Sequence, residues 1–168
     1  MLRLRPYKKC DAKEIISWIR DEKSFHKWSA GLYGKYPITE DDMNHMYEEM
    51  AYSDAFYPMT AFDETGVIGH LVLRFLDDEK KELRFGFIIV NDQRRGNGYG
   101  RKMLLLALKY AFEILKVERV TLVVFDSNPQ AFACYRSVGF RESNTECSSY
   151  NVLGEHWRGI EMEIKNEM

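Results

Sequence analysis

The sequence predicts an α/β fold with one mixed, mostly antiparallel central sheet and helices on both of its faces. Apolar strand-like runs and periodic helix-like runs alternate along the whole chain. A turn at Asp63-Glu-Thr-Gly66 joins two of these runs as an antiparallel hairpin. Later a strand, a helix and another strand follow one another, and this order indicates a parallel crossover.

The first third of the chain is expected to hold one strand and three helices. Leu2–Pro6 is the strand, and Asp11 is expected to cap a helix that carries three isoleucines on one side. Ser24–Trp28 is a second helical stretch. Thr39 and Asp42 resemble a capping box in which Asp replaces the usual Glu or Gln, so a third helix begins there.

The remaining elements follow from apolar runs and from residues that begin or end helices. Asn128-Pro129 begins a helix that Gly139 ends, since proline suits a first turn and glycine suits the position past the last. The expected elements are strands over 57–63, 66–76 and 82–90, a helix over 98–115, a strand over 119–125, the helix over 128–139, and strands over 140–150 and 156–164.

Length and charge restrict the class of protein. The 168 residues are expected to form a single domain, 1–168, because this length suits one hydrophobic core. The chain has 24 basic and 26 acidic side chains, a net charge of -2, so nucleic acid is not an expected partner. No apolar run approaches the roughly 20 residues of a membrane-spanning helix, and the start lacks the apolar stretch of a signal peptide.

The cysteines and histidines predict neither disulfides nor a metal site. Cys10, Cys134 and Cys147 are odd in number and far apart, and free thiols fit a reducing compartment. The four histidines have no metal-ligand spacing. A cytoplasmic protein without a metal is therefore expected.

The stretch most informative about function is a glycine-rich loop between a buried strand and a helix. Gly96, Gly98 and Gly100 alternate with other residues and run directly into the helix. Glycine allows close approach of a ligand to the main chain, and a helix start presents unpaired N–H groups with a positive dipole. Four basic residues add charge, and we expect a phosphate or pyrophosphate site: Arg94, Arg95, Arg101 and Lys102.

Three common phosphate-binding motifs do not fit this loop. The dinucleotide fingerprint fails because Arg101 stands where its last glycine should be, and the P-loop fails because no Gly-Lys-Ser/Thr follows. The other motifs of protein kinases are missing as well. A flexible helix start without a ligand is the simpler alternative.

Two stretches resemble the hallmarks of one enzyme family. Arg95-Gly-Asn-Gly98-Tyr-Gly100 is similar to the Q/R-x-x-G-x-G/A signature of the GNAT superfamily of N-acyltransferases. The stretch from Asn128 to Phe140 resembles the family pattern N-x-x-A-x-x-x-Y-x-x-x-G-F. The detailed resemblance covers about Leu83 to Phe140, and it implies the GNAT-like acyl-CoA N-acyltransferase fold with acetyl-CoA as co-substrate.

The resemblance also implies which residues bind the coenzyme. The pantetheine arm would lie beside the strand that precedes the loop, and the pyrophosphate would sit on main-chain amides of the loop. Asn128 would contact the coenzyme, although capping of its own helix explains an asparagine there equally well. The implied coenzyme-binding residues are Ile88, Ile89, Val90, Arg95, Gly96, Asn97, Gly98, Tyr99, Gly100 and Asn128.

The reaction implied is attack of a neutral amine on the thioester of acetyl-CoA. Tyr135 matches the family's general acid, which protonates the leaving thiolate, whereas helical spacing alone would make it a core aromatic. The resemblance does not identify a single residue as the base that deprotonates the amine. Glu82 is the candidate, Asp92 and Asp126 are alternatives, and each could equally be a solvated carboxylate at a strand end.

The identity of the acceptor amine is left open by the sequence. The variable helices after the first strand usually line the acceptor side in this fold, and here they carry Trp18, Phe25, Trp28, Tyr33, Tyr36 and Tyr47 with acidic residues nearby. An aromatic, acidic pocket would favour a small cationic amine, such as a polyamine or an aminoglycoside. A peptide N-terminus and a free amino acid are also compatible, as are a coenzyme A-binding sensor without activity and a homodimer.

Overall fold

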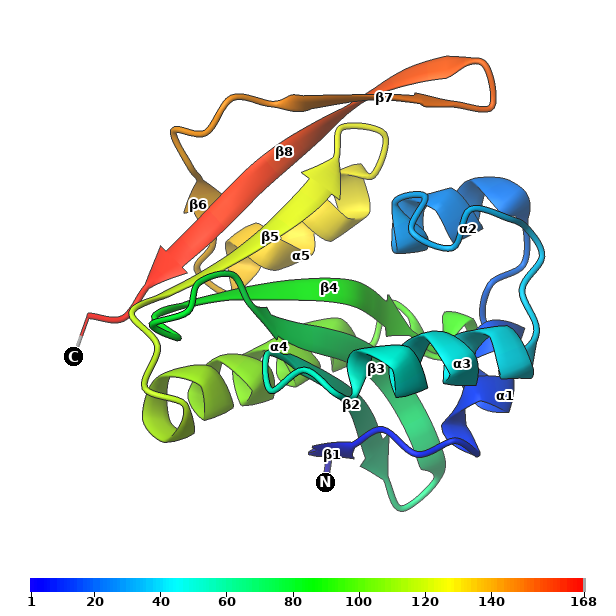
Figure 1. The fold of residues 1–168 in the computed structure, drawn as a ribbon, viewed down its shortest axis with the longest axis horizontal. Coiled ribbons are helices and arrows are strands. Elements are labelled where there is room, and N and C mark those ends of the chain that lie inside the picture. Colours follow the sequence, from blue (N-terminus) through cyan, green and yellow to red (C-terminus); the bar gives the residue numbers. More distant parts are fainter. Residues whose placement is uncertain (168) are drawn as a thin grey trace.

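The computed structural model describes residues 1–167, whose strands form one eight-stranded sheet in the order β1-β2-β3-β4-β5-β8-β6, with β7 paired to β8 (Figure 1). All neighbouring strands are antiparallel except β4 and β5, which are parallel. The bounds are β1 Arg3–Pro6, α1 Asp11–Ser17, α2 Glu22–Ser29, α3 Glu40–Met50, β2 Phe56–Asp63, β3 Gly66–Phe75, β4 Glu82–Val90, η1 Asp92–Arg94, α4 Tyr99–Lys109, η2 Tyr110–Ile114, β5 Arg119–Phe125, α5 Pro129–Ser137, β6 Arg141–Glu142, β7 Ser148–Val152 and β8 Glu155–Lys165.

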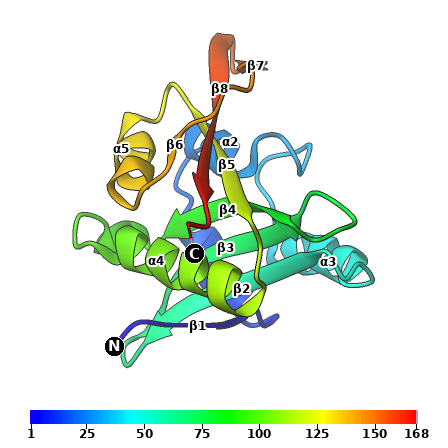
Figure 2. The ribbon, with the colours of Figure 1, turned by 90° about the vertical axis from the view of Figure 1, so that its left-hand side faces the viewer.

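Helices cover both faces of the sheet, as expected (Figure 2). On one face α4 and α5 bury Met103, Leu104 and Tyr135 against the sheet. On the other face α1, α2 and α3 form a second apolar cluster, which includes Ile15 and Met43. The predicted mixed α/β class is confirmed.

The side chains of β4 change face part-way along the strand. Leu83 and Phe85 belong to the cluster under α4 and α5, whereas Phe87 and Ile89 belong to the cluster under α1–α3. Strict alternation would place all four on one face. The change arises at a bulge, because Phe87 has φ 48° and the register with β3 shifts there.

The parallel strands β4 and β5 pair over a short distance and then separate. Their register joins Glu82 to Arg119 and ends at Arg84 with Thr121. Beyond this point the two strands diverge, and the opening between them faces α2 (Figure 1). The second half of β4 keeps its partner β3 but has no strand of the described chain on its other edge, and it leads directly into the glycine-rich loop.

Two sequence expectations about local structure are wrong. Asp11 does not cap α1, because its buried carboxylate accepts bonds of 2.8 Å from both Arg5 and Thr60 and of 2.8 Å from the amide of Lys8. The expected strand over 140–150 is two strands, β6 and β7. Between them Ser143 turns toward Glu161, with Oγ donating over 2.7 Å.

Candidate active site

The glycine-rich loop leaves a run of main-chain N–H groups without partners. Gly96 and Gly98 have φ of 81° and 80°, which turns the chain sharply before α4 begins at Tyr99. Lys102 is the first residue whose amide bonds back, at 3.0 Å to the carbonyl of Gly98. Within residues 1–167, the amides from Arg95 to Arg101 donate to no acceptor. They lie at the positive end of the α4 dipole, which is suited to an anion.

Side chains of the loop donate to its carbonyl groups and thereby hold its shape without using the free amides. Asn97 Nδ2 donates to the carbonyl of Arg94 over 3.1 Å, and Arg95 Nε donates to that of Val90 over 3.3 Å. Arg94 also reaches Thr65 Oγ1 at 2.9 Å. The loop is therefore shaped in advance of any ligand.

The four basic residues around the loop have different partners. Arg101 donates to the carbonyl of Ser137 at the end of α5, so it joins two helices. Lys102 Nζ lies 5.7 Å from the centre of the Tyr99 ring, and Arg94 Cζ lies 5.9 Å from it. Lys102 and Arg95 are exposed and keep their charge available to a bound anion.

Tyr135 is buried on α5 beneath the same end of the sheet. Its ring is 8% exposed and lies 6.3 Å from that of Phe140, centre to centre. Burial raises the pKa of the phenol, so Tyr135 remains protonated at neutral pH. A protonated phenol can donate a proton but cannot act as a base. Asn128 caps α5 through Oδ1, which accepts from the amide of Ala131 over 3.4 Å.

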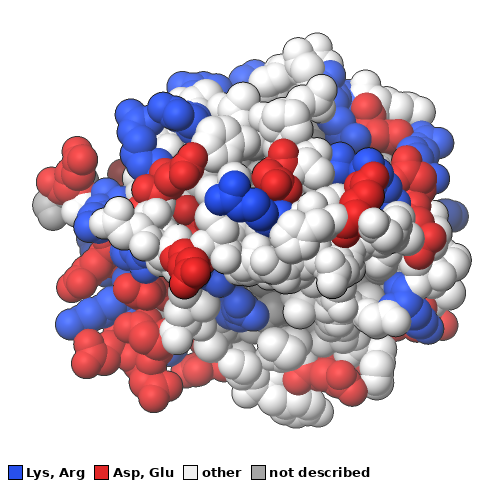
Figure 3. Space-filling view, turned by 90° about the horizontal axis from the view of Figure 1, so that it is seen from above, with Lys and Arg blue, Asp and Glu red and all other residues white. Residues whose placement is uncertain are grey.

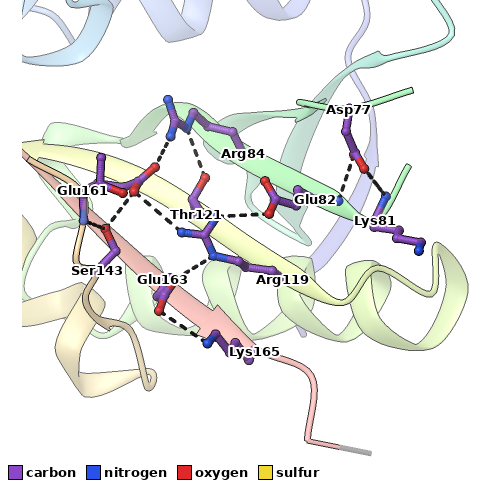
Figure 4. Close-up of polar contacts among 11 residues, drawn as sticks. Asp77, Lys81, Glu82, Arg84, Arg119, Thr121, Ser143, Glu161, Glu163 and Lys165 are labelled. Atoms are coloured by element: carbon purple, nitrogen blue, oxygen red, sulfur yellow. Dashed lines mark hydrogen bonds and ion pairs between the residues drawn. The ribbon is translucent and has the colours of Figure 1, made fainter. Parts of the chain in front are cut away.

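Glu82 lies at the far end of β4 from the loop. Its carboxylate accepts from Arg119 over 3.3 Å, within the network of charged residues in Figure 4. Glu82 also lines an open hollow of about 440 Å³ whose other lining residues are charged: Asp77, Lys81, Glu118, Arg119 and Lys165. Glu82 and Val90 are eight residue steps apart along the strand, a distance of about 26 Å.

The two alternative carboxylates also have protein partners. Asp92 pairs with Arg20 at 2.7 Å, and this hydrogen bond lowers the pKa of Asp92. Asp126 accepts from the amide of Arg158 over 3.0 Å. A lowered pKa makes Asp92 a weaker base, which does not favour it as the group that deprotonates the amine.

A second cavity, of about 240 Å³, lies in the region where β4 and β5 diverge. Aromatic residues form part of its wall, but only Trp28 of the six candidate aromatic residues lines it. Phe25 and Tyr47 belong instead to the core under α1–α3. The lining consists of Lys27, Trp28, Ser29, Ala30, Leu32, Phe56, Val72, Arg74, Arg84, Phe85, Gly86, Phe87, Val123, Phe125 and Tyr150.

The charged residues of this second cavity are basic, which differs from the acidic pocket considered from the sequence. Lys27, Arg74 and Arg84 line it, and none of its described lining residues is acidic. Two of the acidic residues near the helices have partners elsewhere: Asp21 caps α2, and Asp42 completes the capping box of α3 and pairs with Lys35. Two of these basic residues could have been noticed in the sequence, because Arg74 and Arg84 each interrupt a mostly apolar strand.

Arg84 is held in place by neighbouring strands. Its Nε donates to Thr121 Oγ1 over 3.1 Å, and its Nη2 lies 2.5 Å from Glu161 (Figure 4). Burial opposes ionisation of Glu161, but hydrogen bonds and two guanidinium groups hold its pKa below the usual range. The charge of Arg84 is thus neutralised inside the protein.

Other kinds of site find little support in the described part of the chain. No group of three or more His, Cys, Asp or Glu among residues 1–167 is placed to hold a metal ion. Over the same residues, no helix is both long and apolar enough to cross a bilayer. On the face shown in Figure 3, basic and acidic side chains are interspersed, without the broad basic surface that nucleic acids require.

Comparison with known proteins places the chain in a family. The family model described as the acetyltransferase (GNAT) domain matches residues 1–141. The chain belongs to the GNAT acetyltransferases. It is accordingly an acetyl-CoA-dependent N-acetyltransferase.

The relatives of this acetyltransferase include enzymes that act on polyamines. The spermidine N(1)-acetyltransferase of Vibrio cholerae is 23% identical over 92% of this chain and 87% of its own length. The SPbeta prophage-derived uncharacterized N-acetyltransferase YokL of Bacillus subtilis is 22% identical over 74% of this chain and 70% of its own.

Solved structures confirm the fold. The spermidine N-acetyltransferase from Vibrio cholerae in complex with CoA and spermine has a TM-score of 0.82 at 22% identity, over 98% of this chain and 95% of that one. A dodecameric structure of the Vibrio cholerae enzyme in an intermediate state has a TM-score of 0.75 at 22% identity, over 98% of this chain and 93% of that one.

Proposed function

We propose that this acetyltransferase binds acetyl-CoA on the loop before α4 and transfers the acetyl group to a primary amine in the cavity between α2, β4 and β5. The observation that carries the proposal is the run of unpartnered amides from Arg95 to Arg101 at the start of a helix. The pyrophosphate would accept from amides between Arg95 and Gly100, with Asn97 and Tyr99 at its edge.

The pantetheine arm would run along the unpaired edge of β4. Beyond Arg84 no strand of residues 1–167 pairs with this edge, so main-chain groups near Ile88, Ile89 and Val90 can meet the arm. The main-chain N–H of Asn128 donates to the carbonyl of Phe125 over 2.9 Å and its Oδ1 makes the cap of α5, so its side-chain Nδ2 is the group that could donate to the coenzyme.

The chemistry consists of attack by a neutral amine, formation of a tetrahedral intermediate and departure of the thiolate. Burial keeps the phenol of Tyr135 protonated until the C–S bond breaks, when it donates its proton to the departing sulfur. The proton that the attacking nitrogen loses as the amide forms then restores the phenol. The amine must first lose a proton. Arg74 and Lys27 favour this loss because nearby positive charge lowers the pKa of an ammonium group. Glu82 as the base remains a proposal, and its transfer route would need intervening water.

Release of free thiol in the presence of acetyl-CoA and a panel of primary amines tests the proposal. We expect Tyr135→Phe to lower kcat by about 100-fold or more while leaving the Kd for coenzyme A within a factor of about three. Tyr52→Phe is the matched control, because Tyr52 is 96% exposed. Undiminished turnover by Tyr135→Phe would remove Tyr135 from the acid role.

The same assay separates catalysis from a sensing function. A coenzyme A-binding sensor would be protected from thermal unfolding by coenzyme A yet release no thiol with any amine. Retention of a buried phenol at position 135 favours catalysis, because binding alone does not require its proton. A cytoplasmic location and assembly of identical copies are also proposed; light scattering of the purified chain tests the assembly.

A further inference from the structure

Arg74 is a partly buried cation that the protein itself leaves without a counter-ion. It lies on β3, between Phe56 of β2 and Arg84 of β4 in the sheet register. Within residues 1–167 no carboxylate forms an ion pair with it, and it makes no side-chain hydrogen bond. Burial and the neighbouring charge of Arg84 lower the pKa of its guanidinium. The side chain lines the cavity beside α2.

This arrangement lowers the stability of the fold. Like charges directly opposite each other on neighbouring strands are unfavourable, and Arg74 faces Arg84 in this way. Only Arg84 is compensated, because Glu161 lies 2.5 Å from it. A partly buried charge without a partner also loses hydration. Pairs of like charges that destabilise a fold are expected mainly at sites where the protein binds a ligand.

A second cation in the cavity has the same character. Lys27 of α2 lines the cavity with Arg74, and within residues 1–167 it forms no ion pair and no side-chain hydrogen bond. Ser29, the last residue of α2, also contributes to the wall, but its unpartnered Oγ is closed to solvent and does not face the open space. The cavity thus offers two cations without a carboxylate partner in the described structure, and Arg74 is the one that lies in the sheet.

The size of the cavity limits what can use these groups. Its volume of about 240 Å³ corresponds to about eight water molecules of liquid. Aromatic side chains form much of the wall, among them Trp28, Phe87 and Phe125. A molecule the size of an amino acid fits this volume, with apolar groups against the aromatic wall.

We propose that the acceptor is a small amine that carries a carboxylate, and that Arg74 binds the carboxylate. The proposal rests on the proposed function, since it names the acceptor of the same reaction. A planar guanidinium matches a carboxylate in a two-point hydrogen bond. A polyamine would instead bring further positive charge beside Arg74, Arg84 and Lys27, with no acidic lining residue to bind it.

The experiment compares acceptors that differ only in charge. Free amino acids, their neutral carboxamides and spermidine are each supplied with acetyl-CoA, and thiol release gives kcat/KM. We expect the carboxylates to be used best and spermidine worst. Preference for spermidine or for the carboxamides would overturn the inference, as would turnover of peptides but of no free amino acid.

Variants at position 74 link any preference to the proposed contact. Arg74→Gln is expected to lower kcat/KM for the carboxylate acceptors about 10- to 100-fold and for the carboxamides less than about threefold. Arg74→Lys should retain part of the preference because it keeps the charge. Arg3→Gln, an exposed arginine on β1, is the control. Equal losses with both acceptor classes would contradict a role in charge recognition.

Failure of this inference is distinguishable from failure of the proposed function. If acetyl-CoA supports thiol release with some other class of amine, the enzyme assignment stands and only the acceptor is wrong. If no amine supports release although coenzyme A protects the chain from unfolding, the proposed function itself fails, and the inference with it.

Discussion

Trp28 on α2 donates its indole N–H to the main-chain carbonyl of Phe87, over 3.0 Å, in the buried interior. Phe87 is the residue at which β4 bulges and changes the face of its side chains. The bulge disrupts the ladder of hydrogen bonds with β3, and a side chain from a distant helix provides the partner. This bond positions α2 against the strand that lines both proposed ligand sites.

We predict that Trp28→Phe destabilises the protein by about 2–3 kcal/mol, because it leaves a buried carbonyl without a donor and removes part of a packed ring. Urea unfolding measures the change. Trp157→Phe is the control, since Trp157 is also buried but donates to the carboxylate of Glu155, which retains access to water. Equal losses for the two variants would show that ring packing, rather than the bond to Phe87, determines the effect.

The glycines of the loop provide a test of coenzyme binding. Gly98→Ala places a side chain at φ 80°, so we expect a loss of about 1–2 kcal/mol in stability and a Kd for coenzyme A raised about 10-fold or more. Gly34→Ala carries similar strain, at φ 71°, in the irregular segment after α2. Thermal unfolding with and without coenzyme A separates the two effects. Comparable loss of protection in both variants would count against a pyrophosphate at the loop.

Much of the local structure could be predicted because its causes are local. The apolar run from Glu82 to Val90 gave the bounds of β4, and the Thr39 capping box is present with Asp42 as its acidic partner. Both signals lie within a few residues of the element they specify. The unpartnered amides also agree with the expectation from the alternating glycines.

Features that depend on register between distant strands could not be predicted in this way. The pairing of Arg74 with Arg84 requires the register of β3 on β4. Gly86 inside the strand is a typical signal for a bulge, but it does not specify which residues of β3 lie opposite β4. Asp11 similarly had a cap-like position, but the fold brings Thr60 and Arg5 to it. The charge of the acceptor cavity therefore emerged only from the assembled sheet.

His70 should make stability depend on pH. It is fully buried, which lowers its pKa from the ordinary 6.5 to about 4, and its Nε2 lies 2.7 Å from the hydroxyl of Tyr47. Between about pH 6.5 and pH 4, His70 is protonated in the unfolded chain but neutral in the folded protein. The stabilisation is therefore complete above pH 6.5 and is lost as the pH falls toward 4, by roughly 3 kcal/mol.

Urea unfolding between pH 7 and pH 4 measures this dependence for the parent and for His70→Gln. Carboxylates contribute to the slope in both proteins, so the difference between the two curves isolates the histidine. We expect the difference to narrow steadily as the pH falls, because the variant has no proton to take up at this position. Parallel curves over the whole range would mean that His70 does not titrate differently in the two states.

Removing the charge of Arg74 and removing that of Arg84, which face each other across β3 and β4, should change the stability of the protein in opposite directions. Arg74→Met removes an uncompensated cation and keeps an unbranched apolar chain, so we expect stability to rise by about 1 kcal/mol. Arg84→Met leaves Glu161 with one guanidinium partner fewer, and we expect a loss of about 1–2 kcal/mol. Urea unfolding at pH 7 measures both changes. If Arg74→Met instead destabilises the chain as much as Arg84→Met, then Arg74 already has a stabilising partner within the protein, and the reason to assign it to a ligand disappears.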